Sequence, residues 1–213
     1  MPCLPQCERI ILISFRTCFI REQQMKKVII TGILLSLTLL LFSQETPVTT
    51  GWRAIRASEV TVDGRALTTD DPAPEGWINA TVPGTVLTTL VNNSLMPEPW
   101  YGMNNENIPD VWDVGRDYYT YWFFTRFSIP DLDSTRQVWL NFRGINYRAE
   151  IWFNGNLLSD TATDGMFLRR KYNITSLLNH EGHNRLAVKV EPPLNPGKPN
   201  GGQGGDGTIG RDV

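Results

Sequence analysis

Apolar and polar residues alternate through residues 117–190, and this alternation is the strongest structural signal in the chain. In residues 119–129 the odd-numbered positions are mostly bulky and apolar, which predicts a strand with one buried face. The same period of two returns in residues 138–143, 147–153 and 185–190. We interpret these segments as half-buried antiparallel strands. A further strand is expected near Phe167.

The dipeptide Asn154-Gly155 marks a turn between two of these strands. It directly follows the strand that ends at Phe153, and Leu157 and Leu158 resume the apolar run. Asn-Gly is the strongest short hairpin signal, because both residues tolerate a positive φ angle. Together with the alternating segments, this turn predicts an all-β domain built around a β-sandwich core.

The residues before the sandwich show weaker patterns. Four apolar residues there are candidate strand or linker positions: Trp52, Ile55, Val60 and Val62. Asp63-Gly64 has the composition of a turn, and residues 72–83 that of an extended segment. Residues 85–92 carry apolar side chains at helical spacing and predict the one short helix of the domain, which ends at Asn92 and Asn93.

The first 43 residues have the pattern of a secretory signal peptide. Lys26 and Lys27 form a basic start, residues 28–42 an apolar core, and Ser43 is a small residue just before Gln44. Translation would then begin at Met25, with residues 1–24 as upstream sequence. An uncleaved membrane anchor is the alternative. We expect export to the periplasm or outside the cell, cleavage near Gln44, and no membrane association afterwards.

Composition and charge exclude some classes of partner and site. A chain of 213 residues with 41% hydrophobic content suits a single folded domain. Residues 1–43 hold five basic and two acidic side chains, which leaves 15 basic against 20 acidic residues and a net charge near −5. This balance argues against nucleic acid as a partner. All three cysteines, Cys3, Cys7 and Cys18, precede Gln44, so the mature chain would have no disulfide and no cysteine metal site.

Several motifs occur in an order that resembles one family. They are residues 121–127, 140–145, 149–155, 165–167, 172–175 and 184–190. The set resembles the N-terminal sugar-binding domain of glycoside hydrolase family 2. This resemblance implies a galactose-binding-domain-like jelly roll over residues 44–190, followed by a Gly/Pro-rich loop over 191–213 that stops before the next domain. Residues 83–87 and 97–104 are similar to the β-mannosidase and exo-β-glucosaminidase branch.

Residues 97–116 form a long stretch without periodicity. Such loops in compact domains are usually functional or held by packing. In the family, loops on this side of the domain approach the catalytic barrel, so five residues are candidates for substrate contact: Trp100, Tyr101, Asn104, Asn105 and Glu106. The aromatic faces would stack on a sugar, and the amides and the carboxylate would bind hydroxyl groups. The alternative, which burial statistics favour, is that these residues fill the sandwich end or a domain interface.

Three other motifs do not indicate a site. Asn105-Glu106 copies the family's acid/base pair, but that pair belongs at the end of a barrel strand. His180 and His183 are three residues apart in a polar turn and lack a third ligand, so we expect no metal. Residues 202–207 match a dinucleotide fingerprint by letter, yet prolines precede them and no helix is predicted after them, so we expect no cofactor.

The chemistry of the family limits what this chain can do alone. A retaining glycosidase needs two carboxylates about 5 Å apart. In the family both come from a TIM barrel, which takes about 250 residues, so we expect no catalytic residue in this chain. The resemblance implies an N-terminal non-catalytic domain or fragment of an exported retaining β-glycosidase, with a carbohydrate ligand and a missing C-terminal catalytic domain. A free-standing carbohydrate-binding module and a structural interaction domain are the alternatives.

Overall fold

The computed structural model describes residues 24–29, 45–70, 75–129, 136–159 and 164–194. The chain forms two compact units, residues 1–47 and 48–213. In the first unit, residues 24–29 are helical and exposed. No helix within the described ranges is long and apolar enough to cross a membrane. Most of the predicted signal segment, and residues 195–213 of the predicted C-terminal loop, lie outside the described residues.

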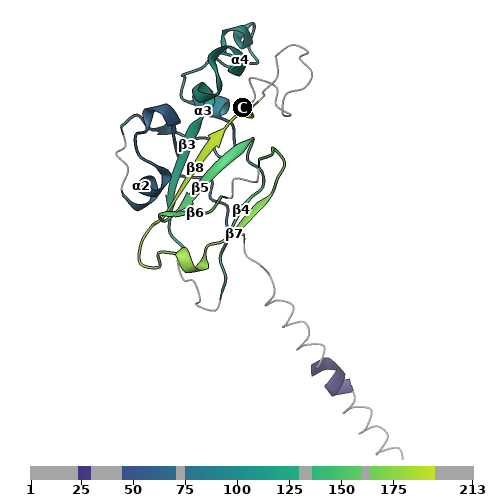
Figure 1. The fold of residues 1–213 in the computed structure, drawn as a ribbon. Coiled ribbons are helices and arrows are strands. Elements are labelled where there is room, and N and C mark those ends of the chain that lie inside the picture. The colour runs from purple at the N-terminus through teal and green to yellow at the C-terminus, as the bar shows by residue number, and fades with distance from the viewer. Residues whose placement is uncertain (1–23, 30–44, 71–74, 130–135, 160–163, 195–213) are drawn as a thin grey trace, which may run out of the picture. The chain divides into compact units, whose positions relative to one another are not determined.

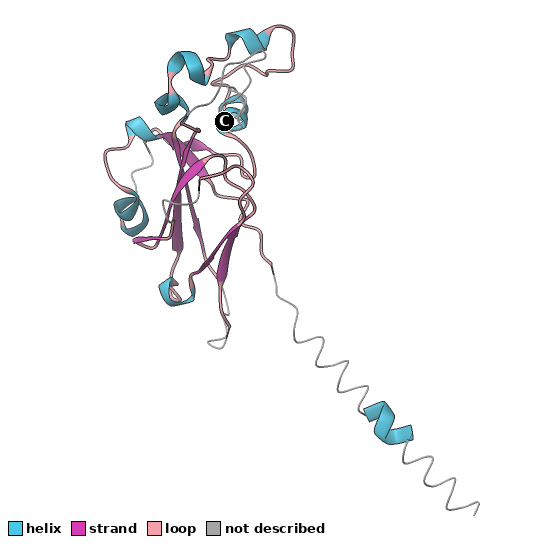
Figure 2. Ribbon diagram, turned by 45° about the vertical axis from the view of Figure 1, so that its right-hand side comes forward, coloured by secondary structure: helices cyan, strands magenta, loops and turns pink. Residues whose placement is uncertain are grey.

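The second unit contains two antiparallel sheets (Figure 1). The larger has the strand order β2-β1-β3-β8-β5-β6, and the smaller pairs β4 with β7. The strands are β1 (Arg53–Arg56), β2 (Ile78–Asn79), β3 (Tyr121–Phe127), β4 (Trp139–Phe142), β5 (Arg148–Phe153), β6 (Asn156–Leu157), β7 (Arg170–Asn173) and β8 (Asn184–Glu191). Figure 2 shows the two sheets facing each other, with the helices outside them. The predicted all-β sandwich is confirmed.

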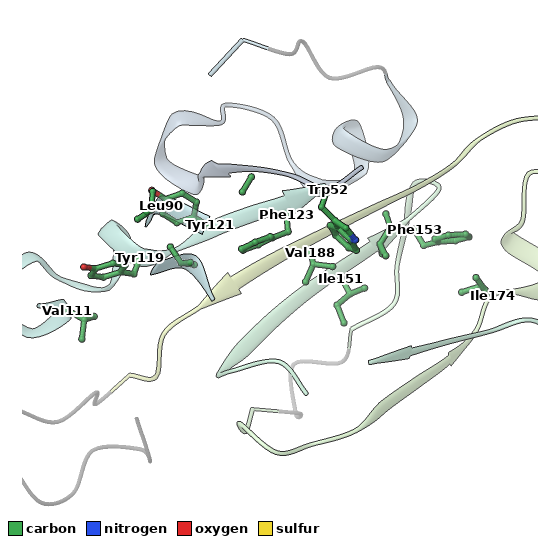
Figure 3. Packing of buried hydrophobic residues seen from close by; sticks show 13 residues of the cluster. Trp52, Leu90, Val111, Tyr119, Tyr121, Phe123, Ile151, Phe153, Ile174 and Val188 are labelled. Carbon is green, nitrogen blue, oxygen red and sulfur yellow. The ribbon is translucent and has the colours of Figure 1, made fainter. Parts of the chain in front are cut away.

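The main core lies between the sheets, on the face that the alternation predicted. Phe123, Val188 and Ile151 are cross-strand partners along β3, β8 and β5, so their side chains point to the same side. All three belong to one buried cluster with Phe153, and Figure 3 shows them together. Leu140 of the smaller sheet packs against the cluster from the opposite side.

The outer face of the central strands is also buried, which corrects the expectation of half-buried strands. Trp122 and Phe124 of β3 join Leu67 in a second apolar cluster. Leu67 comes from α2 (Gly64–Thr69), a helix that covers this face. Aromatic residues occupy both parities of β3, which is why period-two alternation alone could not assign a solvent face.

The Asp63-Gly64 pair begins a helix rather than a turn, which is a second correction. The side chain of Asp63 accepts the backbone N–H of Ala66 at 2.9 Å and so caps α2. Gly64 allows the helix to approach the sheet, because a Cβ atom there would lie 2.1 Å from Cδ1 of Trp152. Asp and Gly are common in turns and at helix starts alike, so the dipeptide could not distinguish the two.

The helix predicted over residues 85–92 is confirmed as α3 (Val86–Asn92). Thr85 caps it, since its Oγ1 accepts the N–H of Thr88 at 2.9 Å, and Leu87 and Leu90 are buried. It is not the only helix: α2 and the four-residue α4 (Val111–Val114) occur as well. Short 3-10 helices lie at Ala57–Glu59, Asn104–Asn107, Arg116–Tyr119 and Thr175–Leu177.

The hairpin at Asn154-Gly155 is confirmed. Both residues have positive φ angles, 45° and 79°, and Phe153 pairs with Asn156 across the turn. The Asn154 side chain also donates to the carbonyl oxygen of Leu177 at 2.8 Å and accepts the N–H of Arg185 at 2.8 Å. The asparagine therefore ties the turn to the neighbouring loop and to β8.

The strand expected near Phe167 begins later, at Arg170. Phe167 lies in a turn, and 86% of its surface is exposed. The ladder with β4 starts where Arg170 pairs with Phe142. Phe167 is in neither buried apolar cluster, so its aromatic side chain does not indicate a strand here.

Candidate functional site

The loop of residues 97–116 is anchored by buried side chains at its base. Ile108 and Val111 are almost fully buried. Asp110 is buried too, and its Oδ1 accepts the backbone N–H of Trp112 at 2.9 Å, which caps α4. Figure 3 shows Val111 beside Tyr119 and Leu90 at one end of the core. The base of the loop is thus part of the folded sandwich.

Aromatic packing holds the residues that lead from the loop into β3. Tyr119 is buried, and its hydroxyl donates a hydrogen bond to the carbonyl oxygen of Pro109. Its ring meets the edge of Tyr118, with ring centres 5.0 Å apart. The guanidinium of Arg56 lies over the other tyrosine, 4.3 Å from the centre of the Tyr118 ring. Strand β1 therefore supports the loop through this arginine.

A charged side chain joins the loop to the end of β8. Arg116 donates from Nε and Nη2 to the carbonyl oxygen of Pro192, at 3.1 and 2.8 Å. Its Nη2 also lies 3.5 Å from Oε2 of Glu191. The loop and the residues that follow β8 consequently share one end of the sandwich, which Figure 1 shows with α3 and α4.

The tip of the loop presents apolar side chains to solvent. Trp100 is 92% exposed and Tyr101 is 77% exposed, and Met103 nearby in the sequence is exposed as well. Trp112, further along the loop in α4, is also exposed. These aromatic residues do not fill the end of the sandwich, and a domain interface stays open as the alternative to substrate contact for them. Three residues later in the chain are buried there instead: Ile108, Val111 and Tyr119.

The polar candidates lie on the same tip, in the 3-10 helix Asn104–Asn107. The Asn104 amide donates to the carbonyl oxygen of Glu98 at 3.0 Å, and the backbone N–H of Tyr101 donates to the same oxygen at 3.3 Å. Asn105 and Glu106 are exposed, and neither side chain hydrogen-bonds to another described residue. The structure thus places all five candidates on one short, internally bonded segment.

The carboxylates of the loop do not form a buried site. Of Glu98, Glu106, Asp110 and Asp113, only Asp110 is buried, and one of its oxygens caps α4. A glycosidase needs its two carboxylates fixed about the scissile bond by a rigid scaffold. Exposed side chains on a loop do not meet this requirement.

Comparison with known proteins assigns the family. The model of the glycosyl hydrolase 2 galactose-binding domain-like family matches residues 58–208. The chain belongs to this family. The matched span of this galactose-binding-like domain includes the whole loop and every described strand except β1.

Relatives of the domain are longer glycosidases. A mannosylglycoprotein endo-β-mannosidase of Lilium longiflorum is 50% identical over 169 residues, which is 76% of this chain and 17% of the relative. An exo-β-D-glucosaminidase of Streptomyces avermitilis is 27% identical over 150 residues, 70% of this chain and 16% of the relative. The chain spans about a sixth of the length of these relatives.

Solved structures show the same fold. An exo-chitosanase of Amycolatopsis orientalis, solved in complex with PNP-β-D-glucosamine, has a TM-score of 0.60 at 25% identity and covers 73% of this chain and 17% of that one. A β-D-mannosidase of Dictyoglomus thermophilum has a TM-score of 0.55 at 24% identity, covering 79% and 19%. The family resemblance drawn from the sequence motifs is confirmed, whereas the five contact residues stay a prediction.

Sequence reasoning missed the residues that position the loop. Asp110, Arg116 and Tyr119 anchor it, and Met103 and Trp112 extend its exposed apolar surface. The one feature of the sequence that pointed to these residues was their position in or beside the aperiodic segment 97–116. Elsewhere, His183 Nδ1 lies 2.9 Å from Ser128 Oγ, and no three His, Cys, Asp or Glu side chains of the described residues form a candidate metal site.

Proposed function

We propose that this chain is the N-terminal, non-catalytic domain of an exported retaining β-glycosidase, and that the tip of its loop contacts carbohydrate. Family membership supports this role, as do relatives named as β-mannosidases and exo-β-glucosaminidases. Each of these relatives is several times longer than the chain, which is long enough to include a separate catalytic domain. The substrate class proposed for the intact enzyme is β-linked mannosides or glucosaminides.

One observation carries the proposed contact role: an anchored loop holds Trp100 and Tyr101 in solvent. Large aromatic side chains are normally buried to a considerable degree, and clustered exposed apolar groups mark interaction sites. The base of the loop is packed through Ile108 and Val111, so the exposed tip is a feature of the folded domain.

The chemistry of the tip suits a sugar. The apolar face of a pyranose ring can stack on an aromatic ring such as that of Trp100, while its hydroxyl groups need hydrogen-bond donors and acceptors. Asn105 supplies an amide with both, and Glu106 supplies a carboxylate acceptor. Because the loop holds no rigid pair of buried carboxylates, its contribution is binding and orientation rather than bond cleavage.

Export is the second part of the proposal, supported by the basic, apolar and small residues in succession from Lys26 to Ser43. The expected mature N-terminus lies within a few residues of Gln44. N-terminal sequencing of material recovered outside the cytoplasm checks this, and a sequence that begins at Met1 or Met25 would contradict it.

A titration tests the carbohydrate contact. Methyl β-mannoside and methyl β-glucosaminide are added to the 213-residue chain while the indole N–H resonances are followed by NMR. We expect dissociation constants in the millimolar range, about 4 kcal/mol of binding free energy. Trp100→Ala and Tyr101→Ala should each weaken binding roughly three- to tenfold, since an aromatic contact contributes about 1 kcal/mol.

Phe167→Ala is the matched control, because Phe167 is an equally exposed aromatic residue in a turn outside the loop. It should bind both sugars like the wild-type chain. Unchanged binding by Trp100→Ala and Tyr101→Ala together would remove the contact role. A free-standing carbohydrate-binding module remains the alternative: a stop codon after Val213 in related genomes supports it, and a continuing frame with barrel motifs supports the enzyme domain.

A further inference from the structure

A second surface of the sandwich carries a depression of about 720 Å³. It lies where the chain enters β1, and its lining includes Thr50 and Arg53 together with Phe124 and Arg126 of β3 and His183 just before β8. No residue of the 97–116 loop lines it. The depression is therefore separate from the proposed carbohydrate contact.

Every ionisable side chain among the lining residues is basic: Arg53, Arg126 and His183. The chain as a whole has a formal net charge of −2, so the basic character is local rather than general. A concave surface lined by one sign of charge concentrates ligands of the opposite sign.

Strand register explains why the arginines come together. Arg53 is the cross-strand partner of Phe124, and Arg126 lies two residues further along β3, so both guanidinium groups are on the same face of the sheet. Arg126 is in turn directly opposite Arg185 on β8. Arg185 therefore lies on the same face of the sheet as Arg126.

Hydrogen bonds orient two of the three basic groups. Arg53 Nη2 donates to the carbonyl oxygen of Trp77 at 2.7 Å, which uses one of the five N–H donors of its guanidinium. The His183 ring is held through Nδ1, 2.9 Å from Ser128 Oγ. Thr50, another lining residue, carries a hydroxyl group that is able to donate a hydrogen bond.

We infer that this depression binds an oxyanion, namely the carboxylate, sulfate or phosphate group of a ligand about the size of a sugar. Guanidinium groups are suited to such groups because their planar fork pairs with two oxygen atoms at once. The volume lies within the range of small-molecule sites and exceeds what a bare inorganic anion needs. The ligand class thus differs from the mannosides and glucosaminides proposed for the loop, which carry no anionic group.

Calorimetric titration of the 213-residue chain with four probes tests the site: glucuronate, glucose 6-phosphate, inorganic sulfate and neutral glucose. The anionic sugars should bind at least tenfold more tightly than glucose, and raising the salt concentration should weaken them, since exposed charges are screened. Sulfate that binds as tightly as glucuronate identifies a free oxyanion as the ligand. Tighter glucuronate binding identifies an acidic sugar.

Arg53→Gln and Arg126→Gln should each weaken glucuronate at least fivefold while both variants remain folded. Arg169→Gln, an exposed arginine beside β7 of the other sheet, is the matched control and should bind like the wild-type chain. Equal affinity for glucose and glucuronate, or wild-type affinity in both arginine variants, would overturn the site. Both arginine variants should bind methyl β-mannoside like the wild-type chain, so this test fails or succeeds independently of the loop.

Discussion

Arg116 joins two parts of the chain that are 76 residues apart, through two hydrogen bonds to the carbonyl oxygen of Pro192. The acceptor lies just after β8, and the donor is the last residue of the aperiodic loop 97–116. A planar guanidinium can reach one oxygen from both Nε and Nη2, whereas an ammonium group presents a single point of contact. This link holds the end of the loop against the residues that follow β8.

Arg116→Ala should lower the free energy of unfolding by about 1–3 kcal/mol, because it removes two hydrogen bonds worth roughly 0.5–1.5 kcal/mol each. Amide hydrogen exchange in residues 98–107 should also accelerate. Arg116→Lys should restore only part of the loss. Arg169→Ala is the control, and a loss of equal size there would show that Arg116 has no special role.

Gly64→Ala should destabilise the domain by about 1–3 kcal/mol, although alanine is the better helix former. The added methyl group would meet the Trp152 ring at 2.1 to 2.6 Å. Chemical denaturation measures the change. In a Trp152→Ala background the penalty should largely disappear, and a penalty that persists there would contradict the proposed contact.

Phe153→Ala should cost about 3–5 kcal/mol, because this side chain is fully buried in the main core. Asn156→Ala should cost far less, since Asn156 is exposed at the other end of the same turn. Thermal melts of the two variants check the register of the β5–β6 hairpin. Equal shifts would mean that the register is wrong.

Asp164 should make stability depend on pH in the acid range. A hydrogen bond from Arg148, at 2.6 Å from Nη2 to Oδ2, holds the pKa of the Asp164 carboxyl below its usual value. Its contribution is therefore complete above the unfolded pKa of about 3.9 and is lost as pH falls through the lower folded value. Both side chains are partly exposed, so the contribution is about 1 kcal/mol or less.

Asp164→Asn tests this dependence by urea unfolding between pH 7 and pH 2. The variant should be less stable than the wild-type chain at pH 7, and the two should converge below pH 4. Asp117→Asn, at an exposed carboxylate in the 3-10 helix after α4, is the control. A wild-type advantage that grows as the pH falls would contradict the assigned direction.

The sequence predicted the structural features that depend on local residue patterns. The inward face of β5 and the Asn154-Gly155 turn followed from alternation and from the tolerance of positive φ angles. The packing of α2 on the outer face of the sheet could not be predicted in this way. It depends on the close approach of Gly64 to Trp152, two residues that are far apart in the chain. Asp63-Gly64 suits a turn and a helix start equally, and only the tertiary contact decides between them.

The candidate site was predictable in composition but not in geometry. The aromatic and amide residues near Trp100 were evident from the sequence. Their exposure was not, since statistics favour burial for tryptophan. The anchors Asp110 and Arg116 act through a helix cap and a backbone carbonyl, and neither contact leaves a periodic pattern in the sequence.

Hydrolysis of aryl β-mannoside by the purified 213-residue chain tests the central claim most directly. The account predicts no turnover above a buffer blank with this substrate, or with aryl β-glucosaminide and β-galactoside, because no carboxylate pair is held rigidly in the loop. Turnover that survives Glu106→Gln, Asp110→Asn and Asp113→Asn together would indicate a contaminating enzyme. Turnover that one of these substitutions abolishes would contradict the claim that the domain is non-catalytic.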